Sequence, residues 1–416
     1  MRKVLLIISA LALLCSCSKQ YREKQVNAIM DGMSVRDKVA QLFVIEISRD
    51  PSDSTKAWQD SVVATYGIGG AILMRGPIEP FIERVNELQA ESLIPILIST
   101  DAEWGAAMRF QEYRPYPRQM QLGRIKHAER LVYRMGRNVA HELRDLGMYV
   151  NYAPVADVGP DSLNLMYDQR EFSNDPHAAA DLCTAYMKGM QDGGIYACGK
   201  HYPGHGDTEV DSHLDLPVLR FDRARMDSIE LVPFGKMINN GLEMMMIAHL
   251  SIPSVDSTGI PMSISEKCIK KLLRGEQGFK GVVITDAVGM KGLSDGSRNA
   301  VEINTAVYRA GSDFILMPDM VVESIEAITD SVNVGTFPLS ELDEKVHRVL
   351  MLKARAGFFD KDFDPCVRDL ERKIKAAERR DTRLQRRMLK AIESSSNPLL
   401  ESATEDGTLV LDKPGI

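Results

Sequence analysis

Short apolar runs recur along the chain, separated by segments whose apolar residues have helical spacing. Strands are predicted at residues 38–47, 66–74, 93–101, 149–158, 193–200, 241–252, 281–288 and 313–318. Helices are predicted at residues 79–92, 128–147, 176–192, 223–240, 265–277, 299–311 and 341–357. The strands are apolar throughout, which is typical of parallel sheets covered on both faces. About eight strand–helix units predict an α/β fold, a (β/α)8 TIM-type barrel, with a doubly wound open sheet as the alternative.

The two ends of the chain depart from this alternation. Residues 20–37 are predicted to form a polar tether that leads into a helix. We expect the barrel domain, with this short N-terminal tether, at residues 17–360. Residues 361–416 begin with a highly charged, helix-forming segment and end without a clear period. This tail is too short and too polar for a core of its own. We therefore expect a helical extension, the stub of a missing second domain, that packs on the barrel or hangs from it.

The first residues have the form of an export signal. A basic start is followed by the apolar run VLLIISALALL, which is too short to span a membrane comfortably as a mature helix. The sequence LCSC at residues 14–17 then resembles the end of a bacterial lipoprotein signal. Cys17 fits the lipid-acceptor position better than Cys15, because Leu14 and Ser16 precede it at the usual places. Removal of residues 1–16 would leave a lipid-anchored protein of the cell envelope, facing the periplasm or on the outer membrane. A plain secretory signal or an uncleaved anchor is the alternative.

Composition narrows the range of partners. The chain has 416 residues, 44% of them hydrophobic, and a net charge of −7, which argues against nucleic acid as the main partner. The cysteines beyond the signal have no CxxC spacing, and Cys183 and Cys198 lie in apolar contexts that favour buried free thiols. We expect a monomer that needs no cofactor and no metal.

Polar residues that can carry chemistry follow five of the predicted segments. The densest stretch, residues 199–213, contains Lys200, His201, Asp211 and His213. Asp211 and His213 alternate, so in an extended loop the carboxylate lies beside the imidazole and can raise its basicity. The remaining candidates are Asp101, Arg109, Arg170, His249 and Asp286. Each alone fits a helix cap, a satisfied core histidine or a polar surface loop, but together they predict one cleft for a polyhydroxylated ligand.

Three segments carry a resemblance to family 3 glycoside hydrolases, specifically to their β-N-acetylglucosaminidase branch. KHYPGHGDTEVDSH at residues 200–213 is similar to the signature loop of that branch. PMSISEKCIKKLLRGEQGFKGVVITDAVGM at residues 261–290 resembles the stretch leading to the nucleophile, and STDAEWGAAMR at residues 99–109 resembles a sugar-binding segment. The resemblance covers residues 27–359, nearly the whole expected barrel.

This resemblance implies a retaining, two-step hydrolysis that removes terminal β-linked N-acetylglucosamine. Asp286 would be the nucleophile, and His213, poised by Asp211, would be the acid/base. Substrate contacts are implied for Asp101, Arg109, Arg170, Lys200, His201, His249 and Met290. His205 and Asp207 would hold the shape of the loop. The resemblance leaves open whether the substrate is a peptidoglycan fragment, a chitooligosaccharide or a host glycan, and whether phosphate can replace water as the acceptor.

Departures from the family pattern and rival functions remain. Trp104-Gly105 replaces a Gly-Gly pair, Glu171 adds a carboxylate near the sugar site, and Val288 is a mild change after the nucleophile. A metal-dependent hydrolase could draw its ligands from His201, His205, Asp207 and His249, although Asp286 would then be idle. Two further functions fit the same residues: a non-catalytic sugar-binding lipoprotein and a β-glucosidase of the same family.

Overall fold

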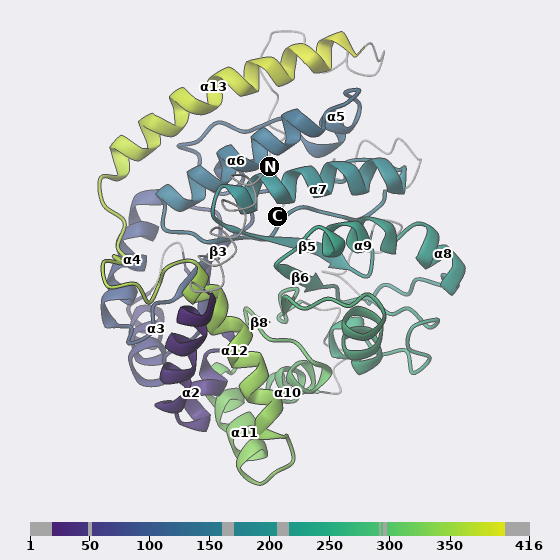
Figure 1. Ribbon diagram of the computed structural model, residues 1–416. Helices are drawn as coiled ribbons and strands as arrows, with labels where there is room; N and C mark the ends of the chain where they lie inside the picture. The colour runs from purple at the N-terminus through teal and green to yellow at the C-terminus, as the bar shows by residue number, and fades with distance from the viewer. Residues whose placement is uncertain are drawn as a thin grey trace, which may run out of the picture.

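The computed structural model describes residues 19–48, 52–159, 170–205, 216–290, 293 and 298–395 (Figure 1). Within these residues, eight strands form one sheet in the order β7-β6-β5-β4-β3-β2-β1-β8, and every neighbouring pair is parallel. The strands are β1 (Phe43–Ile47), β2 (Gly70–Leu73), β3 (Leu97–Thr100), β4 (Val150–Asn151), β5 (Tyr196–Tyr202), β6 (Met244–Ile247), β7 (Val282–Thr285) and β8 (Ile315–Leu316). Asp313 and Phe314 donate backbone hydrogen bonds to Val283 at 2.8 and 2.9 Å, which bring β7 and β8 together. The predicted (β/α)8 barrel is confirmed.

Helices surround the sheet, and local sequence signals fix where several of them begin. The main helices are α2 (Val35–Ala40), α3 (Asp53–Tyr66), α4 (Ile78–Glu91), α5 (Gln119–Gly123), α6 (Glu129–Asp145), α7 (Pro176–Asp192), α8 (Arg223–Ser228), α9 (Leu231–Asn239), α10 (Ala300–Ala310), α11 (Val321–Asn333) and α12 (Leu339–Arg355), with a π-helix at Lys267–Glu276. The Asp175 carboxylate caps α7 by accepting from the backbone N–H groups of His177 and Ala178. Asn299 and Glu302 form a capping box at the start of α10.

Several predicted boundaries were wrong for local reasons. Residues 19–31 are helical rather than a polar tether, and residues 38–40 belong to α2 instead of the first strand. The fourth strand contains only Val150–Asn151. Pro154 has no N–H group, so the pairing becomes irregular there, but Lys200 N still donates to Pro154 O and Ala156 N to Lys200 O. The helix expected at 223–240 is interrupted at Ile229, since Pro233 cannot donate the helical hydrogen bond to its carbonyl group.

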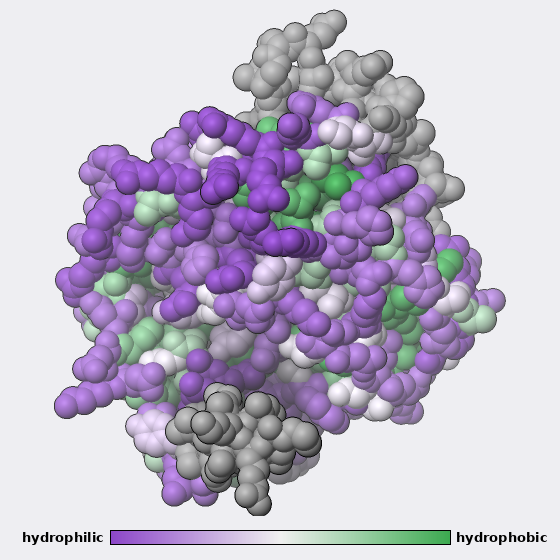
Figure 2. Space-filling view, turned by 45° about the horizontal axis from the view of Figure 1, so that its top comes forward, coloured by the Kyte–Doolittle hydropathy of each residue, from purple (hydrophilic) through white to green (hydrophobic). Residues whose placement is uncertain are grey.

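The charged tail contains one long helix, α13 (Leu370–Ser394), which lies across α6 in Figure 1. Its buried residues include Ala377, Leu384 and Met388, so it packs on the barrel rather than hanging from it. Figure 2 shows a mainly hydrophilic face with scattered apolar patches. Among the described residues, no helix is both long enough and apolar enough to cross a membrane.

Candidate active site

A network of ionic contacts joins the carboxyl ends of β3 and β5. Lys200 Nζ, on β5, lies 2.7 Å from Asp101 Oδ1 and 2.8 Å from Glu103 Oε1, both in the loop after β3. Arg170 donates two hydrogen bonds to the Glu103 carboxylate, at 3.0 and 2.7 Å. Arg109 donates to Asp101 Oδ2. Two carboxylates are therefore held by three cations at one edge of the barrel.

The network keeps its carboxylates charged although the site is buried. Burial alone would raise the pKa of Asp101, but Lys200 and Arg109 hold it at about 2. Burial likewise opposes ionisation of Glu103, yet Arg170 and Lys200 keep its pKa well below the usual range. Burial would lower the pKa of Lys200, but the two carboxylates raise it above its usual value. At neutral pH the site is thus a fixed array of charged donors and acceptors, which suits sugar hydroxyl groups.

A second pair, His201 and Asp157, lies beside this network. His201 Nδ1 is 2.7 Å from Asp157 Oδ2. Asp157 Oδ1 also accepts from the backbone N–H groups of His201 and His205, at 3.2 and 2.8 Å. The Asp157 carboxylate, in the segment that follows β4, is almost fully buried. Because a carboxylate fixes the proton on Nδ1, the other ring nitrogen of His201 is left to contact a ligand.

Asp286 directly follows β7 and is anchored through its main chain. Its N–H donates to Ile247 O at 2.9 Å, and its Oδ1 accepts from Ala287 N at 2.9 Å. Burial would raise the pKa of Asp286, but His201, His249 and the Ala287 N–H together lower it below its usual value. The carboxylate is therefore ionised at neutral pH and only partly covered, as an attacking group requires.

His249 supports the main chain next to Asp286. Its Nε2 lies 3.0 Å from the Ala287 carbonyl oxygen, which can only accept, so Nε2 carries a proton. Its Nδ1 then accepts from the Ser263 hydroxyl at 2.8 Å. Burial lowers the pKa of His249, which favours this neutral form at pH 7. His249 thus acts through Ala287 on the placement of Asp286.

An ionised, backbone-held carboxylate beside a charged, hydroxyl-binding array is the arrangement used to attack an anomeric carbon. Residues 34–352 match the family described as "Glycosyl hydrolase family 3 N terminal domain". The chain belongs to glycoside hydrolase family 3. The resemblance drawn from the sequence is confirmed, and so is the predicted enzyme class, a glycoside hydrolase.

Individual members of family 3 align over much of the chain. A beta-hexosaminidase of Nitrosospira multiformis is 36% identical over 259 residues, which are 60% of this chain and 73% of that protein. A beta-hexosaminidase of Neisseria meningitidis is 35% identical over 270 residues, 62% of this chain and 73% of that protein. The solved structure of a family 3 β-N-acetylglucosaminidase from a Paenibacillus species superposes with a TM-score of 0.72 at 30% identity. It covers 84% of this chain and 68% of that one.

The structure brings most of the predicted family 3 site residues together. Asp101, Arg109, Arg170 and Lys200 share one network, and His201 and His249 both influence Asp286. Met290 is buried, and its N–H donates to Ala287 O at 3.1 Å. Four residues with predicted roles lie outside the described part of the chain: Cys17, Asp207, Asp211 and His213. Their roles stay predictions.

Two site residues were not assigned from the sequence. Glu103 follows Asp101 by two positions, but nothing in the sequence showed that its carboxylate turns inward to Lys200 and Arg170. Asp157 lies near the end of the apolar run at 149–158, six residues beyond β4, and this position was an unused signal. Glu171 follows Arg170 directly, and burial, with a smaller contribution from the Asp157 carboxylate, raises its pKa to about 7. Within the described ranges, no cluster of three His, Cys, Asp or Glu residues is placed to hold a metal ion.

Proposed function

We propose that the chain is a retaining β-N-acetylhexosaminidase that removes non-reducing terminal β-linked N-acetylglucosamine. The observation that carries this proposal is the ionised Asp286 carboxylate at the end of β7, next to the network of Asp101, Glu103 and Lys200. Relatives named beta-hexosaminidase and a β-N-acetylglucosaminidase of known structure support the choice of sugar.

The proposed reaction has two displacements. One Asp286 oxygen attacks the anomeric carbon while the bond from that carbon to the aglycone oxygen breaks, and His213 gives that oxygen a proton. Water then attacks the same carbon, gives its proton to His213 and releases Asp286. Since Asp286 Oδ1 accepts from Ala287 N, Oδ2 is the oxygen that we expect to attack. Asp211 would hold His213 in the required orientation.

Substrate binding follows from the charges around the cleft. Asp101 can accept hydrogen bonds from two adjacent hydroxyl groups, while Lys200 and Arg170 can donate to ring substituents. The Arg170 side chain is 28% exposed, so a ligand can reach the Arg170–Glu103 pair from its arginine side. We propose peptidoglycan fragments or chitooligosaccharides as the natural substrates.

The decisive experiment uses the chain without residues 1–17 and an aryl β-N-acetylglucosaminide. Asp286→Asn keeps the shape of the side chain and should lower kcat by roughly 10⁴-fold or more, because no nucleophile remains. Asp330→Asn changes an exposed aspartate on α11 and should leave turnover unchanged. Turnover that survives in Asp286→Asn would refute the assigned nucleophile.

The same assay separates the rival functions. Faster cleavage of the aryl β-glucoside would favour a β-glucosidase, while sugar binding without any turnover would favour a binding lipoprotein. Loss of turnover with a chelator, restored by a divalent metal, would favour the metal-dependent hydrolase. Product analysis in phosphate buffer tests the choice of acceptor, because a phosphorylase would release N-acetylglucosamine 1-phosphate.

We also propose that Cys17 anchors the protein to a membrane of the cell envelope. The proposal is supported by the apolar run and by the LCSC sequence that ends in Cys17. Labelled palmitate should enter the wild-type chain and Cys15→Ser but not Cys17→Ser. Equal labelling of Cys17→Ser and wild type would reject this acceptor.

A further inference from the structure

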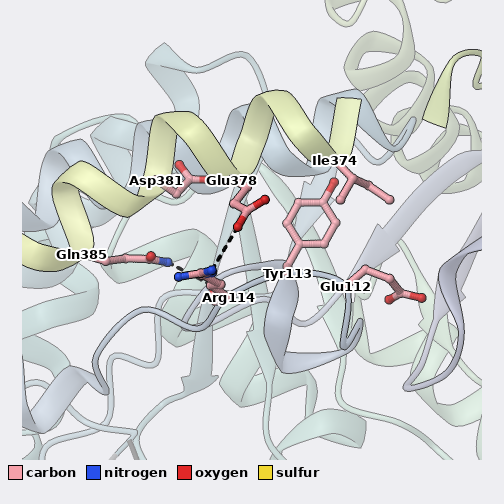
Figure 3. A pocket seen from close by; sticks show the side chains of 7 residues that line it. All are labelled: Glu112, Tyr113, Arg114, Ile374, Glu378, Asp381 and Gln385. Atoms are coloured by element: carbon pink, nitrogen blue, oxygen red, sulfur yellow. Dashed lines mark hydrogen bonds and ion pairs between the residues drawn. The ribbon is translucent and has the colours of Figure 1, made fainter. Parts of the chain in front are cut away.

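The C-terminal helix α13 contacts the loop after β3, which carries Asp101, Glu103 and Arg109. Figure 3 shows α13 side chains directed toward this loop across a small cavity of about 110 Å³. Arg114 Nη2 lies 3.0 Å from Glu378 Oε1. Gln385 Nε2 donates to the Arg114 and Pro115 carbonyl groups at 3.0 and 3.4 Å. Together with Tyr116, which bonds to Asp381, these contacts join three successive loop residues, Arg114, Pro115 and Tyr116, to α13.

The buried contact in this interface is between Tyr116 and Asp381. The Tyr116 hydroxyl donates to Asp381 Oδ1 at 2.8 Å and accepts from Asn138 Nδ2 on α6 at 3.1 Å. Only 3% of Asp381 and 1% of Tyr116 are exposed. Removing either partner of such a bond leaves a buried polar group unsatisfied, at a cost of about 1–3 kcal/mol. This bond therefore constrains the position of Tyr116 more firmly than the exposed Arg114–Glu378 pair does.

Tyr116 in turn holds the part of the loop that lies next to the site. Its N–H donates to the Trp104 carbonyl oxygen at 3.0 Å. Its ring leaves so little room at Gly105 that an added Cβ atom would lie 3.0 Å from Tyr116 Cδ2. Gly105 has a φ of +96°, which favours glycine, so the loop is fixed there by both backbone conformation and packing.

The same turn has a second anchor beneath α13. Ala106 N donates to Glu142 Oε2 on α6 at 2.8 Å. Burial and the neighbouring Asp381 carboxylate raise the pKa of Glu142 well above its usual range. Trp104 and Gly105 are the two residues after Glu103. The turn that they form is held by Tyr116 and Glu142, and both of these residues lie against Asp381 of α13.

We propose that α13 belongs to the catalytic unit and that Asp381 is a positioning residue, acting through Tyr116 on the loop that holds Asp101, Glu103 and Arg109. The inference rests on the proposed function only for its kinetic readout. Asp381 acts at a distance. It fixes Tyr116, Tyr116 fixes the Trp104 carbonyl group, and Trp104 directly follows Glu103 in the chain. An error of about 1 Å in such a placement can cost roughly 10²-fold in rate.

The chain offers a reporter of loop position that does not depend on activity. It contains two tryptophans, Trp58 and Trp104, so Trp58→Phe leaves the loop residue as the single emitter. Trp104 is 8% exposed and lies under the Arg118 guanidinium, whose carbon is 3.4 Å from the ring centroid. Looser attachment of the loop should expose this ring and increase its quenching by acrylamide.

The test compares Asp381→Leu and Tyr116→Phe with Met388→Ala, all in the Trp58→Phe background. Met388→Ala also removes buried packing of α13, but it removes no hydrogen bond to the loop. Asp381→Leu and Tyr116→Phe should each raise the acrylamide quenching constant about twofold or more. They should also raise KM for the aryl β-N-acetylglucosaminide roughly tenfold, with a smaller change in kcat. The double variant should add little to either single one, because both remove the same bond.

Two results would overturn the proposal. One is unchanged quenching and KM in Tyr116→Phe, which is mild enough to fold. The other is equal effects in Met388→Ala and Asp381→Leu at matched loss of thermal stability, because general loosening of α13 would then suffice. If the wild-type chain cleaves no glycoside, the quenching comparison still decides whether α13 sets the loop, so the two failures are distinguishable.

Discussion

Glu103→Gln is the most direct test of the charge network. Glu103 is fully buried and accepts from Arg170 twice and Lys200 once. Breaking a buried ion pair by removing one partner typically costs 3–5 kcal/mol. In Glu103→Gln, Lys200 still has its ion pair with Asp101, and Arg170 is partly exposed to water. The positive charges of both residues therefore remain partly compensated. We therefore expect a loss of about 2–3 kcal/mol in the free energy of unfolding at pH 7.

The pH dependence of this loss identifies its cause. The folded-state pKa of Glu103 lies below the usual 4.5, so its stabilisation is present above pH 4.5 and disappears as the pH falls toward the folded value. Urea unfolding should therefore show a large difference between wild type and Glu103→Gln at pH 7, and a smaller one below pH 4. Glu344→Gln, at an exposed glutamate on α12, should change stability by less than about 0.5 kcal/mol. A difference that does not shrink in acid would refute the electrostatic explanation.

Further predictions concern three other carboxyl groups. Asp157→Asn should raise KM about tenfold, because the amide oxygen stays with the His201 and His205 N–H groups and the amide NH2, which can only donate, then faces His201 Nδ1; steady-state kinetics with unchanged KM would contradict this. Burial raises the pKa of Glu171 to about 7, so the contribution of Glu171 to stability should fall as the pH rises from 4.5 through 7. In urea titrations, Glu171→Gln should therefore gain stability relative to wild type between pH 5 and pH 8. Glu142→Gln should retain the Ala106 contact and, because the pKa of Glu142 is raised, gain stability over wild type only at high pH; thermal melts at several pH values check this.

The alternation of elements was predictable from the sequence, whereas their ends were not. Continuous apolar runs identify buried parallel strands because both faces of such strands are covered. The same runs do not show where pairing stops. In the run at 149–158 the regular strand is only Val150–Asn151, while irregular backbone bonds with β5 continue past Pro154 to Ala156 and bring Asp157 to His201. The irregular end that the pattern missed is therefore the part that provides a site residue.

Site residues were predictable from the sequence where their position at the end of a strand identifies them. They were not predictable where only a contact with a distant residue identifies them. Asp101 and Asp286 directly follow β3 and β7, and Lys200 lies near the carboxyl end of β5; these positions alone direct them to one edge of the barrel. Glu103 received no role from the sequence, because only the folded chain brings Arg170 to it from 67 positions away. Long-range pairing of this kind leaves no spacing signal in a single sequence.

In α13, one charged residue, Asp381, interrupts an otherwise apolar helix face. Leu370, Ile374, Ala377, Leu384, Met388 and Ile392 have the spacing of one helix face. Asp381 lies in the middle of this face, and a charged residue there makes the segment look like a solvated appendage. The structure explains the interruption, since Asp381 is buried against Tyr116 and the loop beside the site. Replacement of a buried ionic group and its partner by apolar residues is often neutral or stabilising, so the presence of Asp381 at this position supports the proposed role in fixing the geometry of the loop.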